Sequence, residues 1–177
     1  MSAKRMILIS FLAALTAVGA FLKIPLGITS ITLQFMFTAM AGILLGAKDG
    51  SISQLVYVLI GLVGFPVFTL GGGISYIFQP SFGFLLGLVP AAFVIGTLIK
   101  ENVTFGRIFL ACLAGLAVLY LIGLPYMYLI CNLYLGKALS IGYVLTYGML
   151  IYLPGDFLKI LVCALICPKI FKLLQRQ

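Results

Sequence analysis

The sequence predicts an all-α integral membrane protein in which six transmembrane helices form one membrane domain over residues 1–177. Hydrophobic residues make up 64% of the chain and charged residues only 8%, with a mean hydropathy of +1.30. This composition leaves too little polar surface for a soluble domain. Long apolar runs separated by short lysine-containing breaks are typical of helical spans, and the alternating pattern of an outer-membrane barrel is absent.

Charge-free segments delimit the predicted spans. They run from Met6 to Leu22, Leu33 to Ala47, Ser53 to Phe68, Phe82 to Ile99, Ile108 to about Ile122, and Pro154 to about Leu174. Some are shorter than the roughly 20 residues that a perpendicular helix needs, so tilt and snorkelling must complete the crossing.

The basic residues divide unequally between the two sides of this topology. An even number of spans puts both termini on one side, where most basic residues also fall: Lys4, Arg5, Lys48, Lys100, Arg107, Lys169, Lys172 and Arg176, against Lys23 and Lys137 opposite. The positive-inside rule makes that side cytoplasmic. The net charge of +8 therefore marks span ends, and no basic face indicates nucleic-acid binding.

Residues 1–20 also resemble a signal peptide, but the membrane-embedded sequence downstream favours a retained first helix.

Three longer connections fall on the outer side: Lys23–Thr32, Thr69–Ser81 and Gly123–Leu153. Irregular backbone at membrane depth is tolerated where it lines a cavity, so these connections predict a binding pocket. The last one carries six of the nine tyrosines, which fit an interfacial aromatic belt with one or two facing a ligand. Within it, the segment from Ile141 to Leu153 is too short to span and predicts a surface or re-entrant helix.

Asp156 is the strongest candidate for a functional residue. The chain has only three acidic side chains, and Asp49 and Glu101 sit beside lysines in expected loops, whereas Asp156 lies in apolar sequence. Lys159 follows three residues later on the same helical face, and Pro154 places Asp156 in the first turn of the last span. A charge in hydrocarbon costs roughly 2.5 to 3.5 kcal/mol, so such a pair indicates a functional site. The alternative is a structural ion pair that joins two spans.

Catalytic and metal chemistry find little support. The chain has no His, and its four Cys are scattered through apolar sequence, so neither a zinc site, a disulfide framework nor a His-activated nucleophile is indicated. No phosphate-binding G-x-x-x-x-G-K-[ST] loop is present, so the chain does not hydrolyse ATP itself. We expect no cofactor and no enzyme activity; a small membrane enzyme that uses Asp156 as acid or base is the alternative.

Two further segments stand out. The glycines Gly71–Gly73 allow a ligand to approach the backbone, and Tyr76, Gln79 and Ser81 follow; the alternative is a flexible hairpin between two spans. In the first span, Ala13 and Ala17 lie one turn apart, as in faces that permit close helix packing. That face either packs inside the bundle or meets a partner subunit.

Several segments, in order, now resemble one family. They are Pro25-Leu26-Gly27 leading to Ile31-Thr32-Leu33-Gln34, Ala41-Gly42-Ile43-Leu44-Leu45-Gly46, Gly61-Leu62-Val63-Gly64-Phe65-Pro66-Val67-Phe68 with Gly71-Gly72-Gly73, Gln79-Pro80-Ser81-Phe82-Gly83-Phe84, and Leu153-Pro154-Gly155-Asp156-Phe157-Leu158-Lys159. Together they resemble the BioY family, the biotin-specific substrate-capture (S) component of energy-coupling factor (ECF) transporters. The resemblance covers nearly the whole chain and is weakest from Tyr126 to Gly148. Relatives often have Pro-Thr where this chain has Pro80-Ser81, which keeps the hydroxyl.

The resemblance implies a six-helix S-component in the bacterial plasma membrane that captures biotin from outside. Its partners would be a transmembrane coupling protein and two ATPase subunits. The implied biotin site comprises Asp156, Lys159, Gln79, Gly73, Tyr76, Ser81, Thr32, Gln34 and Tyr143. Ala13 and Ala17 match the alanine motif by which S-components are thought to dock on the coupling protein. An S-component for thiamine or riboflavin, and a self-sufficient channel or secondary transporter, are the alternatives within transport.

Overall fold

The computed structural model of the chain describes residues 3–26, 29–100 and 103–175. Helices account for most of it, with one small antiparallel sheet. The elements in chain order are α1 (Ala3–Phe21), β1 (Lys23–Leu26), β2 (Thr29–Thr32), α2 (Gln34–Val63), η1 (Ile74–Phe78), α3 (Phe82–Ile99), α4 (Phe105–Leu129), η2 (Ile130–Tyr134), α5 (Ile141–Leu145), η3 (Thr146–Leu150) and α6 (Leu153–Gln175).

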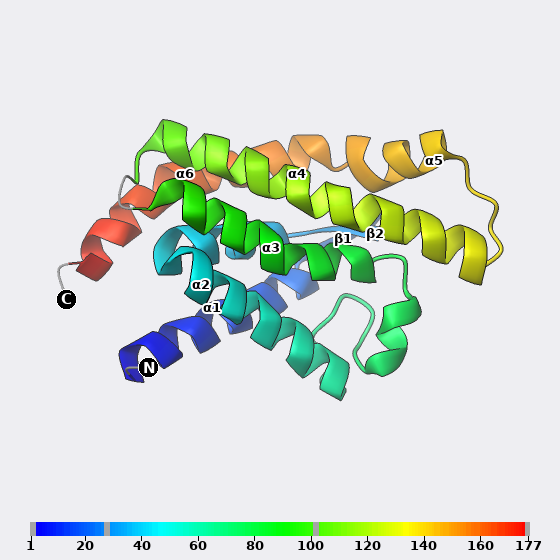
Figure 1. The fold of residues 1–177 in the computed structure, drawn as a ribbon, viewed down its shortest axis with the longest axis horizontal. Helices are drawn as coiled ribbons and strands as arrows, with labels where there is room; N and C mark the ends of the chain where they lie inside the picture. Colours follow the sequence, from blue (N-terminus) through cyan, green and yellow to red (C-terminus); the bar gives the residue numbers. More distant parts are fainter. Residues whose placement is uncertain (1–2, 27–28, 101–102, 176–177) are drawn as a thin grey trace.

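The helices form a bundle in which α2 packs against α1 and α3, α3 against α4, and α6 against α2 and α4. Helix α1 begins and helix α6 ends at the same end of the bundle, while η1 and α5 lie toward the other end (Figure 1). Large apolar side chains cover the outside: Val63, Leu110 and Leu121 are 80%, 67% and 74% exposed. Such a surface suits contact with lipid rather than water.

Among the described residues, four helical segments are long and apolar enough to cross a membrane: Ala3–Phe21, Gln34–Val63, Phe82–Ile99 and Phe105–Tyr134. Helix α6 has 23 residues but carries several charges. The structure therefore establishes a mostly helical membrane protein, and the six-span topology with cytoplasmic termini stays a prediction.

Helix α2 consists of two arms, residues 34–45 and 47–63, that meet at Gly46. Gly46 has φ 79° and ψ 178°, a conformation essentially restricted to glycine. A Cβ on Gly50 would lie 2.8 Å from the carbonyl oxygen of Ala41, although nine residues of continuous helix would span about 13.5 Å. The chain therefore folds back at Gly46, and the two arms correspond to the predicted spans Leu33–Ala47 and Ser53–Phe68.

The predicted end of the fifth span near Ile122 is wrong. Helix α4 continues through Pro125 to Leu129, and η2 extends it to Tyr134, so the irregular connection shrinks to residues 135–140. A proline inside a helix costs about 3 kcal/mol, which tertiary contacts must offset here. The Tyr126 hydroxyl donates to the carbonyl of Ile77 in η1, and the Phe84 ring fills the space beside Gly123. Tyr126, Tyr128 and Tyr134, which were expected in a loop, are thus helical.

Asp49 was also misplaced by the sequence pattern. It lies in the second arm of α2, is buried, and forms a two-point ion pair with Arg5 of α1, where a loop beside Lys48 was expected. The pair ties the start of α1 to α2. Glu101 and Arg176, which the topology argument also used, lie outside the described residues.

A second tie joins the same helices deeper in the bundle. Thr16 of α1, Thr38 and Gln54 are all fully buried. The Gln54 Nε2 donates to Thr16 Oγ1 at 3.3 Å, and the Thr38 hydroxyl donates to Gln54 Oε1 at 2.8 Å. Thr16 itself donates to the carbonyl of Leu12, one turn earlier in α1, at 2.9 Å. Polar groups from three helical segments are therefore satisfied inside an otherwise apolar interior.

The connections predicted to lie on the outer side contain short elements. Strands β1 and β2 form an antiparallel hairpin in which Lys23 pairs with Thr32 and Ile24 with Ile31. The segment predicted as a short helix before the last span contains α5 and η3, and α6 then begins at Leu153. Asp156 lies in the first turn of α6, which confirms the placement predicted from Pro154.

Candidate functional site

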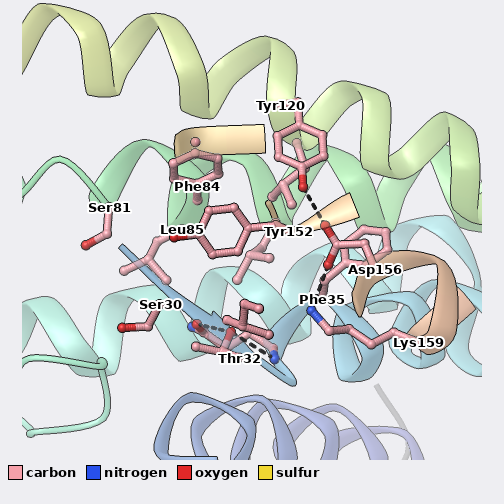
Figure 2. Close-up of a pocket in the computed structure, with 15 residues that line it drawn as sticks. Ser30, Thr32, Phe35, Ser81, Phe84, Leu85, Tyr120, Tyr152, Asp156 and Lys159 are labelled. Carbon is pink, nitrogen blue, oxygen red and sulfur yellow. Dashed lines mark hydrogen bonds and ion pairs between the residues drawn. The ribbon is translucent and has the colours of Figure 1, made fainter. Parts of the chain in front are cut away.

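A cavity opens between the hairpin, the start of α2, and helices α3, α4 and α6. Its lining combines polar and apolar side chains from segments far apart in the sequence: Ser30, Ile31, Thr32, Gln34, Phe35, Ser81, Phe84, Leu85, Leu88, Leu119, Tyr120, Gly148, Tyr152, Asp156 and Lys159. In Figure 2 the Asp156–Lys159 pair lies at one end, Ser30 and Ser81 at the other, and Phe84, Leu85 and Tyr152 between them. The cavity is thus polar at both ends and apolar in the middle.

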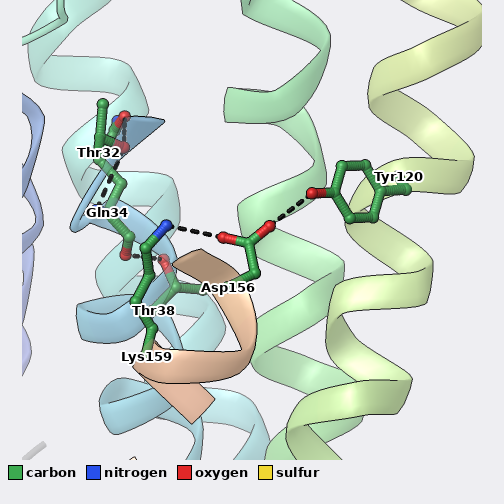
Figure 3. Close-up of polar contacts among 6 residues, drawn as sticks. All are labelled: Thr32, Gln34, Thr38, Tyr120, Asp156 and Lys159. Atoms are coloured by element: carbon green, nitrogen blue, oxygen red, sulfur yellow. Dashed lines mark hydrogen bonds and ion pairs between the residues drawn. The ribbon is translucent and has the colours of Figure 1, made fainter. Parts of the chain in front are cut away.

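Asp156 and Lys159 form a buried ion pair in the first two turns of α6. Lys159 Nζ lies 2.7 Å from Asp156 Oδ1, and the two residues are only 8% and 5% exposed. The hydroxyl of Tyr120, from α4, donates to the other carboxylate oxygen (Figure 3). Both oxygens of Asp156 are therefore held, one from its own helix and one from α4.

This arrangement has a definite chemical character. Opposite charges in contact make the pair net neutral, which reduces the cost of keeping each charge out of water. Each carboxylate oxygen can accept more than one hydrogen bond, and the ammonium group has three hydrogens. The pair can therefore accept from and donate to the same polar, uncharged ligand group.

Thr32 and Gln34 contribute another polar edge where β2 passes into α2. The Thr32 hydroxyl donates to Gln34 Oε1 at 2.9 Å, and Gln34 Nε2 donates to the Tyr57 hydroxyl at 2.8 Å (Figure 3 shows the first contact). Gln34 is 8% exposed and lines the cavity. Both the oxygen and the nitrogen of its carboxamide are therefore hydrogen-bonded within the protein.

Ser81 lines the cavity just before α3, and Tyr76 supports it from behind. Tyr76 is 4% exposed, and its hydroxyl lies 3.3 Å from Ser81 Oγ and 2.8 Å from Thr69 Oγ1. Lys23 Nζ donates to the carbonyl of Thr69. Tyr76 is thus not part of the lining, but it holds a residue that is.

Besides Tyr76, three more of the expected ligand residues lie outside the cavity lining: Gly73, Gln79 and Tyr143. The Gly73 N–H donates to the carbonyl of Gly61 at 2.7 Å, and Gln79 is exposed on the connection between α2 and α3. Tyr143 is 37% exposed and stacks on Tyr147 with ring centroids 4.3 Å apart. The cavity therefore gathers Asp156, Lys159, Thr32, Gln34 and Ser81 from the sequence-based set.

Several lining residues were not found from the sequence. Tyr120 sits in an apolar helical run, where nothing in the local pattern separates it from packing residues. Tyr152 had been grouped with the interfacial tyrosines, yet it is 7% exposed and lies in the middle of the cavity (Figure 2). Phe35 and Phe84 lie in apolar sequence and were not singled out as candidate ligand residues. Only the fold, which brings α2, α3, α4 and α6 together around the cavity, identifies these residues.

The two alanines of α1 expected at a docking surface face inward. Ala13 is 4% exposed and belongs to the hydrophobic core, and Ala17 is packed against that core. The outward face of α1 instead carries Ala14, between Phe11 at 55% and Val18 at 49% exposure. Helical periodicity explains the difference, since residues one position apart on a helix point about 100° apart. The structure thus favours the packing alternative for Ala13.

Comparisons with known proteins agree with one another. The family model described as "BioY family" matches residues 1–176. A protein of Lysinibacillus sphaericus named "Probable biotin transporter BioY" is 43% identical over 172 residues, 96% of this chain and 88% of that protein. The "Biotin transporter BioY" of Thermotoga maritima is 34% identical over 174 residues, 96% of this chain and 97% of that protein. A crystal structure of the S-component for biotin from an ECF-type ABC transporter superimposes with a TM-score of 0.81 and 27% identity, covering 97% of this chain and 95% of that one.

Proposed function

Because the chain belongs to the BioY family, we propose that it binds biotin in the cavity between the hairpin and helices α2, α3, α4 and α6. In this proposal it is the S-component of an ECF-type uptake transporter and is not itself an enzyme. The observation that carries the site assignment is the distribution of polarity in the cavity, with a buried, neutral ion pair at one end and hydroxyls at the other (Figure 2).

Biotin has a matching distribution of chemistry. Its ureido group has two N–H donors and a carbonyl acceptor, its fused bicycle is apolar, and its valerate chain ends in a carboxylate. We assign the ureido group to the Asp156–Lys159 end, where the carboxylate accepts from N–H and the ammonium donates to the carbonyl. Phe84, Leu85 and Tyr152 would then contact the apolar bicycle and chain.

The valerate carboxylate is assigned to the opposite end of the cavity. Ser81 immediately precedes α3, whose N-terminal dipole favours a negative group. Ser30 and Ser81 offer hydroxyl donors there, and Tyr76 holds Ser81 in place. Gly73, Gln79 and Tyr143 are proposed to contact the ligand as it enters, since their segments belong to the connections at the outer end.

The remaining parts of the proposal concern topology and partners. We propose six spans in the plasma membrane with both termini cytoplasmic, which the common end of α1 and α6 supports (Figure 1). A transmembrane coupling protein and two ATPase subunits would energise uptake. We propose that the coupling protein docks on α1. All four cysteines are buried, so single cysteines introduced at loops would report topology by labelling from each side.

The function is tested by equilibrium binding of labelled biotin to the purified chain, with thiamine and riboflavin as competitors. We expect displacement by unlabelled biotin alone. No binding of labelled biotin, together with binding of labelled thiamine or riboflavin, would assign the chain to another vitamin. Uptake with and without co-expressed coupling and ATPase subunits then tests the transport role.

Biotin methyl ester tests the orientation of the ligand. Relative to biotin, its affinity should fall in the parent chain and fall less in Ser81→Ala.

A further inference from the structure

Tyr57 lies directly behind the cavity without lining it. It belongs to the second arm of α2, is 1% exposed, and packs edge-on against Phe68 with ring centroids 5.6 Å apart. Its hydroxyl makes two hydrogen bonds: it accepts from Gln34 Nε2 at 2.8 Å and donates to the backbone carbonyl of Val67 at 3.0 Å. Tyr57 therefore connects a cavity residue to the connection that follows α2.

The direction of these hydrogen bonds is fixed by the carbonyl at one end. A backbone carbonyl only accepts, so the single hydroxyl hydrogen of Tyr57 is used on Val67. The Tyr57 oxygen can then only accept, which turns the nitrogen of the Gln34 carboxamide toward it. The carboxamide oxygen consequently faces Thr32, whose hydroxyl donates to it at 2.9 Å. Reversing the direction of these hydrogen bonds would leave the Val67 carbonyl without a donor, which is costly in an apolar interior.

This direction determines what the cavity edge offers a ligand. Gln34 and Thr32 both line the cavity. The Gln34 nitrogen carries a second hydrogen, so a ligand oxygen beside it meets a donor. The Thr32 hydrogen is committed to Gln34, so a ligand N–H beside Thr32 meets an acceptor.

We propose that Tyr57 is a positioning residue that sets the hydrogen-bond polarity of the Gln34–Thr32 edge and thereby its selectivity among ligands. The proposal deepens the proposed function and rests on it, because biotin supplies the ligand whose binding is measured. Tyr57 acts through Gln34 and touches no ligand itself.

The experiment is a double-mutant cycle on biotin affinity. Tyr57→Phe keeps the ring contact with Phe68 and removes only the hydroxyl. We expect about a tenfold loss of biotin affinity, because the Gln34 carboxamide loses the partner that orients it. In a Gln34→Leu background, Tyr57→Phe should cause no further loss. Tyr134→Phe is the matched control, since Tyr134 is 60% exposed, stacks on Phe78 and is absent from the lining; its affinity should equal that of the parent.

The outcomes separate the two proposals. A parent chain that binds no biotin overturns the proposed function and this inference with it. A parent that binds biotin, with Tyr57→Phe binding equally well or with additive losses in the double variant, overturns the inference alone. If Tyr57→Phe does not fold, Gln34→Glu decides: a carboxylate cannot donate, so affinity should fall below that of Gln34→Leu, and unchanged affinity would refute a role for the donor direction.

Discussion

Replacing Asp156 by Asn tests the ion pair at the end of the cavity. The substitution preserves the side-chain volume but removes the charge that Lys159 Nζ meets at 2.7 Å. Lys159 is only 8% exposed, so it would remain as a buried charge without a counter-charge. Breaking such a pair from one side costs about 3 to 5 kcal/mol of stability. Lys159→Met should destabilise the protein comparably, whereas the double variant Asp156→Asn/Lys159→Met should recover much of the loss.

The same variants should behave differently toward biotin. A charge-assisted hydrogen bond contributes about 1.5 to 3 kcal/mol, so losing the carboxylate acceptor should weaken binding about ten- to 150-fold. Restored stability in the double variant should not restore this affinity. Thermal unfolding in detergent and equilibrium binding of labelled biotin, measured on all four proteins of the cycle, distinguish the two effects. A double variant that is as stable as the parent and binds biotin equally well would show that the pair is only a structural tie.

Three other predictions follow from the structure. The isolated chain should bind biotin with nanomolar affinity, about −12 kcal/mol, and a millimolar constant in the binding assay would refute the biotin assignment. Ala13→Trp should destabilise the bundle by overpacking its core. Ala14→Trp should leave unfolding and biotin binding unchanged but reduce co-purification with the coupling subunit, because Ala14 is exposed. Normal co-purification of Ala14→Trp would show that the outward face of α1 is not the docking surface. Gly46→Ala should lower the free energy of unfolding by about 1 to 3 kcal/mol in thermal unfolding, because φ is 79° at this position. In the control Gly106→Ala, an added Cβ also meets no neighbour but φ is not positive, so stability should change little. Equal effects of the two substitutions would contradict the account of the turn.

How far the sequence predicts this site depends on the range of the interactions involved. Asp156 and Lys159 were found because charges are rare in the chain and because three residues of spacing place them on one helical face. Tyr120, 36 residues from Asp156, meets it only when α4 packs against α6, and no local pattern encodes that contact. The same limitation explains Asp49, whose partner Arg5 is 44 residues away.

The sequence pattern also misplaced one helix end. Pro125 is ordinarily a helix breaker, yet α4 runs through it and past the predicted end of the fifth span near Ile122. Contacts of Tyr126 and Gly123 with η1 and α3 carry the helix past the proline, and they become available only once the bundle forms. Conversely, the start of α6 was predicted correctly because Pro154 acts on its own neighbours.

The buried contacts of Thr16, Thr38 and Gln54 have a consequence for how the chain enters the bilayer. Thr16 satisfies its own hydroxyl within α1 through the carbonyl of Leu12, so α1 can reside in lipid alone. Gln54 takes both of its contacts from other segments, Thr16 and Thr38. An amide without partners costs about 4 to 8 kcal/mol in a medium that cannot hydrogen-bond. The second arm of α2 is therefore a poor candidate for independent insertion, and the turn at Gly46 lets both arms enter together as a hairpin against an α1 that is already in place.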